Sequence, residues 1–543
     1  MKRCFSMLAI LMVAVLVFAP GIALSGSPEL AAKQVFRWGH NTSDINTLDP
    51  AFSTSNPTYT AGGWIFNGLV RVKPGTVDFS KLEGDLARSW DISGDHLTYT
   101  FYLRKGVQWH KGYGEFTAED VKCSFDRLRD KSVASPYGAK YIGIKEVKAV
   151  DRYTVKIILK KPNAFFLMDQ MLAFQAGMIV PKKLIDKRGK GNLGLEIIGT
   201  GPFQFDKYIA KEKVVLVRND NYFRGAPTLE KVEFYFMPSM TSKTFAFING
   251  DLDAIVGHRD PEWIKDILKE PGVVVDALPL GSPATLHFNM TVKPLNDVRV
   301  RKALAYAIDR KQMHLYFGTV WKEMTAPVPP SYFGALPKEE TPYDYQYNYD
   351  LEKAKKLLAD AGYPGGGIKL KAFSTTRSNY LSCYEQIAEM WRPLGVELKI
   401  EVVDHSTYHH KIRKNLNDVV VYYAPRPPFA DSYLTQFYYS KSIIGKPTGI
   451  TNFSHYGDVD ADGDGVIDNI DSLIEQARSE MNPERQKKLY YKAQLQLLKD
   501  CPSKPLHVLK KVNVRHDYFD PGIDMKGILI SSYPLEKARL LKH

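Results

Sequence analysis

Residues 84–126 read GDLARSWDISGDHLTYTFYLRKGVQWHKGYGEFTAEDVKCSFD, the most informative stretch of the chain. Apolar side chains recur at every second residue, which predicts a strand with one buried face: Leu97, Tyr99, Phe101 and Leu103. The turn-forming residues 93–95 precede this strand. Thr117 stands where a helix N-cap is expected, and apolar residues follow it at helical spacing: Val121, Phe125 and Leu128.

The same stretch resembles the solute-binding receptors of ABC importers, in the peptide- and nickel-binding family (solute-binding family 5). That family carries the run L-A-x-S-W, then L-T-Y-T-F-x-L-R-x-G-V, then F-T-A-E-D-V, which recurs here within residues 86–121. Later runs agree with the family in order and spacing, from about Phe36 to the C-terminus: GTGPFQF at 199–205, LVRNDNYF at 216–223, FNM at 288–290, NDVRVRKALAYAIDR at 296–310 and YDLEKAKKLLADAGYP at 349–364.

The resemblance implies an α/β fold of the two-lobed periplasmic-binding-protein (Venus flytrap) type, with an extra domain in the first lobe. Strand-like and helix-like patterns alternate along the whole chain, which also favours α/β or α+β. We expect lobe I to contain residues 36–67, 197–281 and 511–543, the extra domain to span 68–196, and lobe II to span 282–510.

The clearest helical patterns come late in the chain. One lies within residues 297–313, with an apolar stripe of Val300, Leu304, Ala307 and Ile308. Two more begin after the N-caps Asp350 and Asn482, and Gly362 with Pro364 ends the first of these.

The first 25 residues predict a cleaved secretory signal. Lys2 and Arg3 precede a short apolar run, and residues 23–25 are small enough for cleavage. The run is short for a membrane anchor. The only early cysteine, Cys4, stands before the run rather than after it. We therefore expect a free periplasmic protein rather than a tethered lipoprotein.

The charge of the chain is basic, +13 at pH 7. A basic exported protein could favour anionic ligands, but a solvated surface of mixed sign also explains the value. Because no dense Lys/Arg run with interleaved aromatic residues occurs, nucleic acid is not expected as a partner. Cys123, Cys383 and Cys501 could form one disulfide after export, and their spacing does not select a pair.

The resemblance implies binding by lobe closure, without a covalent step. The sequence carries no Gly-x-Ser-x-Gly, His-Glu-x-x-His or P-loop motif, so we predict that the chain is not an enzyme. The implied partners are a peptide or other small solute and an ABC permease with its ATPase, and the receptor should be a monomer. The alternatives are an exported enzyme that reuses the fold, and a receptor that binds a metal chelate or senses its ligand.

Two segments are candidates for ligand contacts. Family members place the loop after T-L-D-P, here residues 47–50, at the cleft, which makes these polar side chains candidates: Ser53, Thr54, Ser55 and Asn56. An ordinary surface loop is the other interpretation. Residues 418–423 read as a strand whose Tyr422 and Tyr423 could stack on a ligand, although strand aromatics are more often core.

The loop after that strand departs from the pattern of peptide-binding relatives. Those relatives carry an aspartate here that pairs with the ligand's α-amino group, and the equivalent place falls at Arg426 or Pro427. Asp431 occupies a separate acidic position a few residues later. Since arginine prefers carboxylate or phosphate to an amine, we expect an anionic or uncharged ligand rather than a standard free peptide.

Two further patterns suggest metals. His405 and His409 lie four residues apart, a spacing that can hold a soft or borderline metal, although a solvated His cluster also fits. Residues 460–471 read D-x-D-x-D-G-x-I-D-x-x-D, which resembles an EF-hand-type calcium loop that ends in Asp rather than Glu. The expected ligands of a structural Ca²⁺ are Asp460, Asp462, Asp464, the Val466 carbonyl, Asp468 and Asp471, and an acidic surface turn is the alternative.

Overall fold

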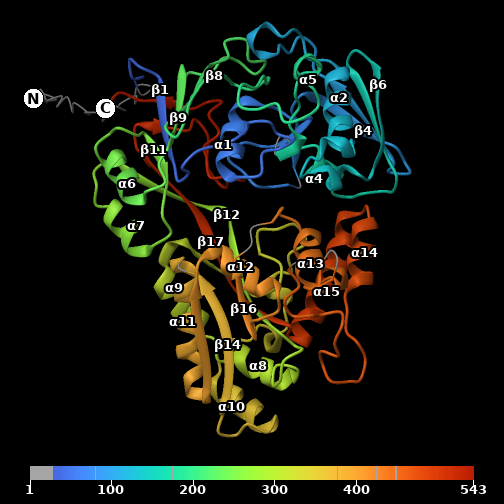
Figure 1. Cartoon of the computed structure of the whole chain (residues 1–543), viewed down its shortest axis with the longest axis vertical. Coiled ribbons are helices and arrows are strands. Elements are labelled where there is room, and N and C mark those ends of the chain that lie inside the picture. Colours follow the sequence, from blue (N-terminus) through green and yellow to red (C-terminus); the bar gives the residue numbers. More distant parts are fainter. Residues whose placement is uncertain are drawn as a thin grey trace, which may run out of the picture.

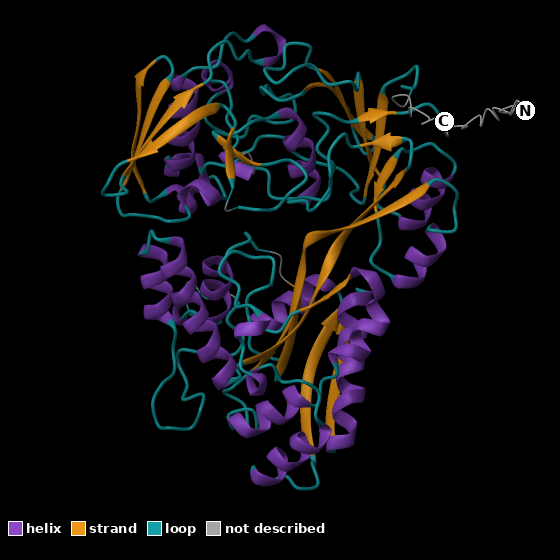
Figure 2. Ribbon diagram, turned by 180° about the vertical axis from the view of Figure 1, so that it is seen from behind, coloured by secondary structure: helices purple, strands orange, loops and turns teal. Residues whose placement is uncertain are grey.

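The computed structural model describes residues 29–543 except 80, 173–174, 376, 424–425, 447–448 and 450, so the predicted signal segment lies outside the described residues. The chain forms a mixed α/β structure in two parts (Figures 1 and 2). The long strands β12 (Val273–Phe288) and β17 (Ser503–His516) run from one part into the other (Figure 1).

One nine-stranded sheet extends through both parts, in the order β16-β12-β17-β11-β1-β10-β9-β8, with β13 beside β17. Strands β10 and β11 flank β1 in parallel, and β12 and β17 are antiparallel. The remaining bounds are β1 (Val35–His40), β8 (Phe203–Ile209), β9 (Lys213–Arg218), β10 (Lys231–Phe236), β11 (Ala254–Val256), β13 (Trp321–Glu323) and β16 (Val419–Tyr423). Segments far apart in the sequence therefore meet in this sheet.

The register of β12 against β17 breaks between Leu278 and Ser282. Gly281 lies in this break, where a Cβ atom would be 2.0 Å from the Leu509 carbonyl oxygen. Only glycine allows the two backbones to approach this closely. The irregular pairing therefore marks the place where the two strands pass between the parts.

A separate four-stranded sheet, β4-β5-β7-β6, lies within the first part and packs against α2 (Ala118–Arg129) (Figure 1). Its strand β5 (Thr98–Leu103) buries every second residue, and Thr117 and Asp120 form a capping box at the start of α2, so both predictions for this stretch are confirmed. The other strands of this region are β2 (Val70–Val72), β3 (Leu82–Gly84), β4 (Ala87–Ile92), β6 (Ile144–Asp151) and β7 (Thr154–Leu159).

The first part also holds helices α1 (Asn56–Ile65), α3 (Gly138–Tyr141), α4 (Phe166–Gln170), α5 (Lys182–Arg188), α6 (Met240–Ile248) and α7 (Pro261–Ile267), and the short pair β18 (Phe519–Asp520) and β19 (Arg539–Leu540). Among the described residues, no helix combines the length and the apolar character that crossing a membrane requires. Cys123, Cys383 and Cys501 are unpaired.

The second part surrounds the parallel strands β14 (Ile368–Thr375) and β15 (Val396–Val403) with helices (Figure 2). These helices are α8 (Val298–Tyr306), α9 (Arg310–Phe317), α10 (Leu351–Asp360), α11 (Ser378–Trp391), α12 (His405–Arg413), α13 (Ala430–Tyr438), α14 (Asp471–Ser479) and α15 (Pro483–Asp500). The caps Asp350 and Asn482 are confirmed.

The single helix expected within residues 297–313 is divided into α8 and α9. The Asp309 carboxylate accepts hydrogen bonds from the backbone N–H groups of Lys311 and Gln312. It therefore acts as a new N-cap and ends the first helix. The apolar residues Ala307 and Ile308 stay buried in the turn between the two helices.

An aromatic contact joins the two parts away from β12 and β17. The ring of Phe165, from the loop before α4, stacks on Phe429, from the segment before α13, with centroids 4.5 Å apart. Phe165 is buried and lies in one hydrophobic cluster with Phe429. This contact is made between the parts and therefore favours their closed arrangement.

We expect Gly281→Ala to lower the free energy of unfolding by about 1–3 kcal/mol, because the added methyl group would push β12 away from β17. Urea unfolding followed by circular dichroism measures this change. Gly143→Ala is the matched control, since a Cβ there meets no atom within 4 Å, and we expect a change within about 0.5 kcal/mol. An equal loss in both variants would contradict the role given to Gly281.

Candidate functional site

A cavity of about 500 Å³ lies between the two parts, where β17 passes from one to the other. Leu509, Lys511 and Val512 of β17 line it. The first part adds Asn56 and Arg259, and the second part adds Tyr316, Arg377 and Ser382. Because both parts contribute side chains, a solute bound here would contact both and hold them together.

Three cationic side chains line this cavity. The Arg259 Nη1 donates to Ser282 Oγ at 3.1 Å, the Lys511 Nζ donates to the Leu529 carbonyl, and Arg377 stands at the N-cap position of α11. Within the described part of the chain, none of the three forms an ion pair with a carboxylate. One acid, Asp260, also lines the cavity, but its carboxylate accepts the Trp263 N–H at 3.0 Å and caps α7.

Basic groups that line the cavity lose protons more readily than usual. Burial, together with the nearby Arg259, lowers the pKa of the Lys511 ammonium to about 7. Burial also lowers the pKa of the Arg259 guanidinium to about 10. The pKa of His258 is lowered by burial, and the charges of Lys243 and Arg259 add to this effect against the opposing charge of Asp260. An anion in the cavity would relieve this repulsion.

A second, larger cavity of about 700 Å³ also lies between the two parts. Lys73, Lys81 and Lys526 line one side of it and Lys487 the other, and Asp78 lies among them, paired with Lys81 at 3.4 Å. Both spaces between the parts are therefore rich in basic side chains.

Of the four residues predicted in the 53–56 loop, Asn56 lines the first cavity. Ser53 is buried, and its N–H and Oγ both donate to the Asp49 carbonyl, at 2.8 and 2.9 Å. Thr54 is exposed, and Ser55 caps α1. Their side chains therefore shape the loop and place Asn56 at the start of the helix.

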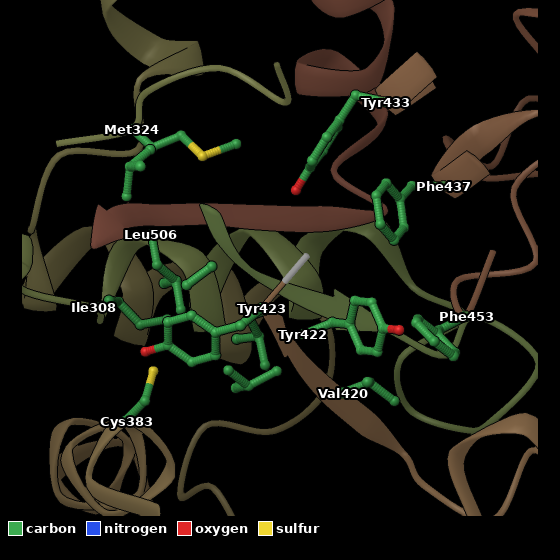
Figure 3. Packing of buried hydrophobic residues seen from close by; sticks show 14 of the residues in the cluster. Ile308, Met324, Cys383, Val420, Tyr422, Tyr423, Tyr433, Phe437, Phe453 and Leu506 are labelled. Atoms are coloured by element: carbon green, nitrogen blue, oxygen red, sulfur yellow. The ribbon is translucent and has the colours of Figure 1, made fainter. Parts of the chain in front are cut away.

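The tyrosines of β16 lie among buried hydrophobic side chains (Figure 3). The Tyr422 ring contacts Phe453 at 5.1 Å and Phe437 at 5.9 Å between centroids. The Tyr423 hydroxyl bonds to the Asn379 carbonyl at 3.0 Å and to His507 Nε2 at 2.9 Å. Tyr423 thus stands behind the cavity wall, in contact with its lining residue Asn379.

Arg426 and Asp431 have partners within the second part. The Arg426 Nε donates to Gln436, and its guanidinium lies 5.5 Å from the Phe437 ring centroid. The Asp431 carboxylate accepts from Arg478 at 3.0 Å and from the Tyr490 hydroxyl at 3.4 Å. Burial raises the pKa of Asp431 despite the opposing charge of Arg478. These contacts tie α13 to α14 and α15.

His405 and His409 lie on one face of α12, with their Nε2 atoms 3.2 Å apart. Burial lowers the pKa of both imidazoles, and the neighbouring His405 helps to bring that of His409 to about 4. Neutral imidazole nitrogens at this separation can bind one metal ion.

The acidic loop brings together only part of the predicted calcium ligands. Oxygens of Asp460, Asp462 and Asp464 lie within 4.8 Å of one another. The Asp471 carboxylate instead accepts hydrogen bonds from the backbone and hydroxyl of Ser440. Val466 is exposed, and its N–H donates to Asp464 at 2.9 Å. The Asp468 carboxylate accepts the Ala461 N–H at 2.8 Å, and one of its oxygens lies within 4.8 Å of oxygens of Asp462 and Asp500.

Comparison with known proteins identifies the family. The model of the bacterial extracellular solute-binding proteins, family 5, matches residues 81–444. The dipeptide-binding protein of Escherichia coli (strain K12) is 32% identical over 405 residues, which cover 69% of this chain and 73% of that protein. The chain belongs to family 5 of the bacterial extracellular solute-binding proteins.

Solved structures of this family share the fold. The PBP/SBP MoaA from A. tumefacien R10, in complex with mannopinic acid, is 35% identical, with a TM-score of 0.75 over 94% of this chain and 100% of that one. The periplasmic binding protein DppA from Helicobacter pylori, in complex with the peptide STSA, is 28% identical. Its TM-score is 0.73, over 95% of this chain and 99% of that one. The expected two-lobed α/β fold and the receptor class are therefore confirmed, and the two parts are the lobes of a family 5 receptor.

Family 5 proteins bind peptides or other small solutes and work with an ABC permease, and the relatives found are binding proteins rather than enzymes. The division of this receptor into the residue ranges given above stays a prediction.

Sequence reasoning missed Arg259, Arg377 and Lys511 in this family 5 receptor. The local sequence does not mark Lys511, because residues 505–514 also contain His507, Lys510 and Asn513. Arg259 and Arg377 lie in connecting segments after β11 and β14, and their local sequence does not show that they meet.

We expect Asp431→Asn to lower the free energy of unfolding by about 1–2 kcal/mol and to leave solute binding within twofold, because its partners are Arg478 and Tyr490. Thermal unfolding and calorimetric titration check the two parts of this prediction. Asp458→Asn is the control, since Asp458 forms an exposed pair with Lys446. Loss of binding without loss of stability would instead place Asp431 in the ligand site.

Proposed function

We propose that this receptor works outside the cytoplasm, in the periplasm after removal of its signal segment. It captures a small anionic solute between its lobes as a monomer and delivers it to the permease and ATPase of an ABC importer. One observation carries the choice of solute: Arg259, Arg377 and Lys511 meet in the interlobe cavity, where no described carboxylate pairs with them. Cations gathered in one cavity favour a counter-charge, and a carboxylate-bearing solute would supply it.

The relatives support an acidic solute. MoaA, at 35% identity, is described in complex with mannopinic acid, whereas the less similar DppA is described with a peptide. In addition, the loop where peptide-binding members carry an aspartate for the α-amino group holds Arg426 here. Both observations favour a ligand that presents negative charge to the protein.

Binding would proceed by closure. Arg259 would contact the solute from the first lobe and Lys511 from β17, which passes between the lobes. Arg377 would contact it from the second lobe. The solute would favour the closed arrangement because only there do all three cations reach it. No bond in the solute is broken, so the receptor acts without catalysis and releases its cargo unchanged, whether for import or for sensing.

A metal chelate is the second candidate ligand. The facing Nε2 atoms of His405 and His409, 3.2 Å apart, favour it. The charge of Arg377, which lines the cavity, also contributes to the lowered pKa of both imidazoles. Nickel bound to free histidine is a suitable probe for this candidate.

We expect mannopinic acid, used as a carboxylate probe, to bind more tightly than the peptide STSA or nickel–histidine in calorimetric titration. Lys511→Gln should weaken its binding at least tenfold because a cation is lost from the cavity. Lys510→Gln is the matched control, since the adjacent Lys510 Nζ donates to the exposed Thr319 carbonyl at 3.0 Å. Tighter binding of the peptide would refute the anionic ligand, and equal losses in both variants would refute the role of Lys511.

The affinity for the acid should depend on pH. With the pKa of Lys511 at about 7 in the empty cavity, the ammonium is charged below this pH and neutral above it. The acid binds the charged form, so its affinity should be constant between pH 5.5 and 6.5 and fall by up to tenfold per pH unit above 7.5. Lys511→Gln should show a flatter profile over the same range, and an affinity that rises with pH would be inconsistent with this account.

A further inference from the structure

A second charged site lies in the second lobe, where the 460–471 loop meets the end of α15. Asp462 and Asp468 from the loop and Asp500 from the helix each offer a carboxylate oxygen, and these oxygens lie within 4.8 Å of one another. This group differs from the calcium ligands predicted within residues 460–471, because Asp500 comes from a helix beyond the loop.

Asp500 is the distinctive member of the group. It is only 1% exposed, and its Oδ1 is buried without a hydrogen-bond partner in the described part of the chain. Its Oδ2 accepts the Tyr456 hydroxyl at 2.6 Å, which fixes the orientation of the carboxylate. A buried, oriented carboxylate oxygen without a donor is costly unless a cation meets it.

In Asp462, as in Asp500, one carboxylate oxygen accepts a hydrogen bond and the other does not. The Asp462 Oδ2 accepts Lys499 Nζ at 2.7 Å, while its Oδ1 is buried and lacks a partner among the described residues. The Asp468 Oδ2 accepts the N–H groups of Ala461 and Asp462, at 2.8 and 3.3 Å. Each carboxylate is therefore held by one oxygen, and for Asp462 and Asp500 the other oxygen is left for a ligand.

The positive charge already present is arranged around this group. Lys499 bonds to the outer oxygen of Asp462, and Lys302 lies within electrostatic range of the same carboxylate. The buried guanidinium of Arg301 donates to the carbonyls of Ala461 and Asp500, the latter at 2.7 Å, and so holds the loop against the helix end. None of these groups donates to the Oδ1 atoms of Asp462 and Asp500, where a cation would bind.

We propose that Asp462, Asp468 and Asp500 bind one calcium ion, which ties the 460–471 loop to the C-terminal end of α15. Carboxylate oxygens favour a hard cation, and Ca²⁺ accepts irregular sets of oxygen ligands more readily than Mg²⁺ does. Asp460 and Asp464 lie next to Asp462 and add negative charge at the mouth of the site. Asp471, bonded to Ser440, takes no part.

The first test uses the full-length mature receptor after metal removal with EDTA, titrated calorimetrically with CaCl₂ alone and with MgCl₂ alone. We expect one Ca²⁺ per chain, weaker binding of Mg²⁺ by at least tenfold, and a melting temperature about 2 °C higher in excess CaCl₂. Absence of calcium binding, or equal binding of the two cations, would overturn the proposal.

The second test separates the two possible ligand sets. Asp500→Asn and Asp468→Asn should each weaken Ca²⁺ binding at least tenfold, while Asp471→Asn should stay within threefold of the unsubstituted receptor. Circular dichroism confirms folding, and Asp468→Asn decides the result if the buried Asp500→Asn misfolds. If Asp471→Asn loses calcium as strongly as the other two variants, or if Asp468→Asn retains it, the assignment to the end of α15 is wrong.

Discussion

The pairing of β12 with β17 is the constraint on which the rest of this receptor depends. These two strands belong to one sheet and pass together between the lobes, and their register breaks at Gly281, where the backbone lies against the Leu509 carbonyl. The same crossing places Leu509, Lys511 and Val512 along the interlobe cavity. The element that joins the lobes therefore also lines the proposed ligand site, so a change of lobe orientation alters the cavity directly.

The cavity gathers three cationic side chains that lack a carboxylate partner among the described residues. Buried cations elsewhere are held in different ways: Arg127 pairs with Asp49, whereas Arg301 donates to backbone carbonyls. In the cavity, Arg259 and Lys511 lie near each other, and burial lowers the pKa of both. Such an arrangement costs stability in the empty protein and favours a negatively charged solute, which is how a binding site can gain affinity from unsatisfied groups.

The aromatic contact between Phe165 and Phe429 adds a second connection between the lobes. It lies apart from the cavity cations and is apolar, so it contributes to closure without selecting a solute. The Phe165–Phe429 contact thus adds to closure independently of the charged residues that are proposed to bind the solute.

Local sequence patterns predicted the local structure well. The alternation in residues 97–103, the N-cap Thr117 and the helices after Asp350 and Asn482 all depend on neighbouring residues, and the structure confirms them. The helix expected over 297–313 failed because the competing cap at Asp309 was not recognised.

The candidate sites were harder to predict because they are assembled across long sequence separations. Asn56 was named from the sequence, but Arg259, Arg377 and Lys511 meet it only through the packing of the two lobes. In the same way, Asp462 and Asp468 were named, whereas Asp500 joins them through the position of α15. Family resemblance supplied the receptor class, and only the three-dimensional arrangement supplied these charge clusters.

The interlobe cavity is proposed to hold an anionic solute. Native mass spectrometry of the receptor purified from its own host tests this claim most directly, because it reports what occupies the cavity without a choice of probe. We predict a stoichiometric small molecule that carries carboxylate or other acidic groups and that is lost from an Arg259→Gln, Lys511→Gln double variant. A bound cationic or uncharged solute, or an ordinary peptide retained by that variant, would contradict the claim.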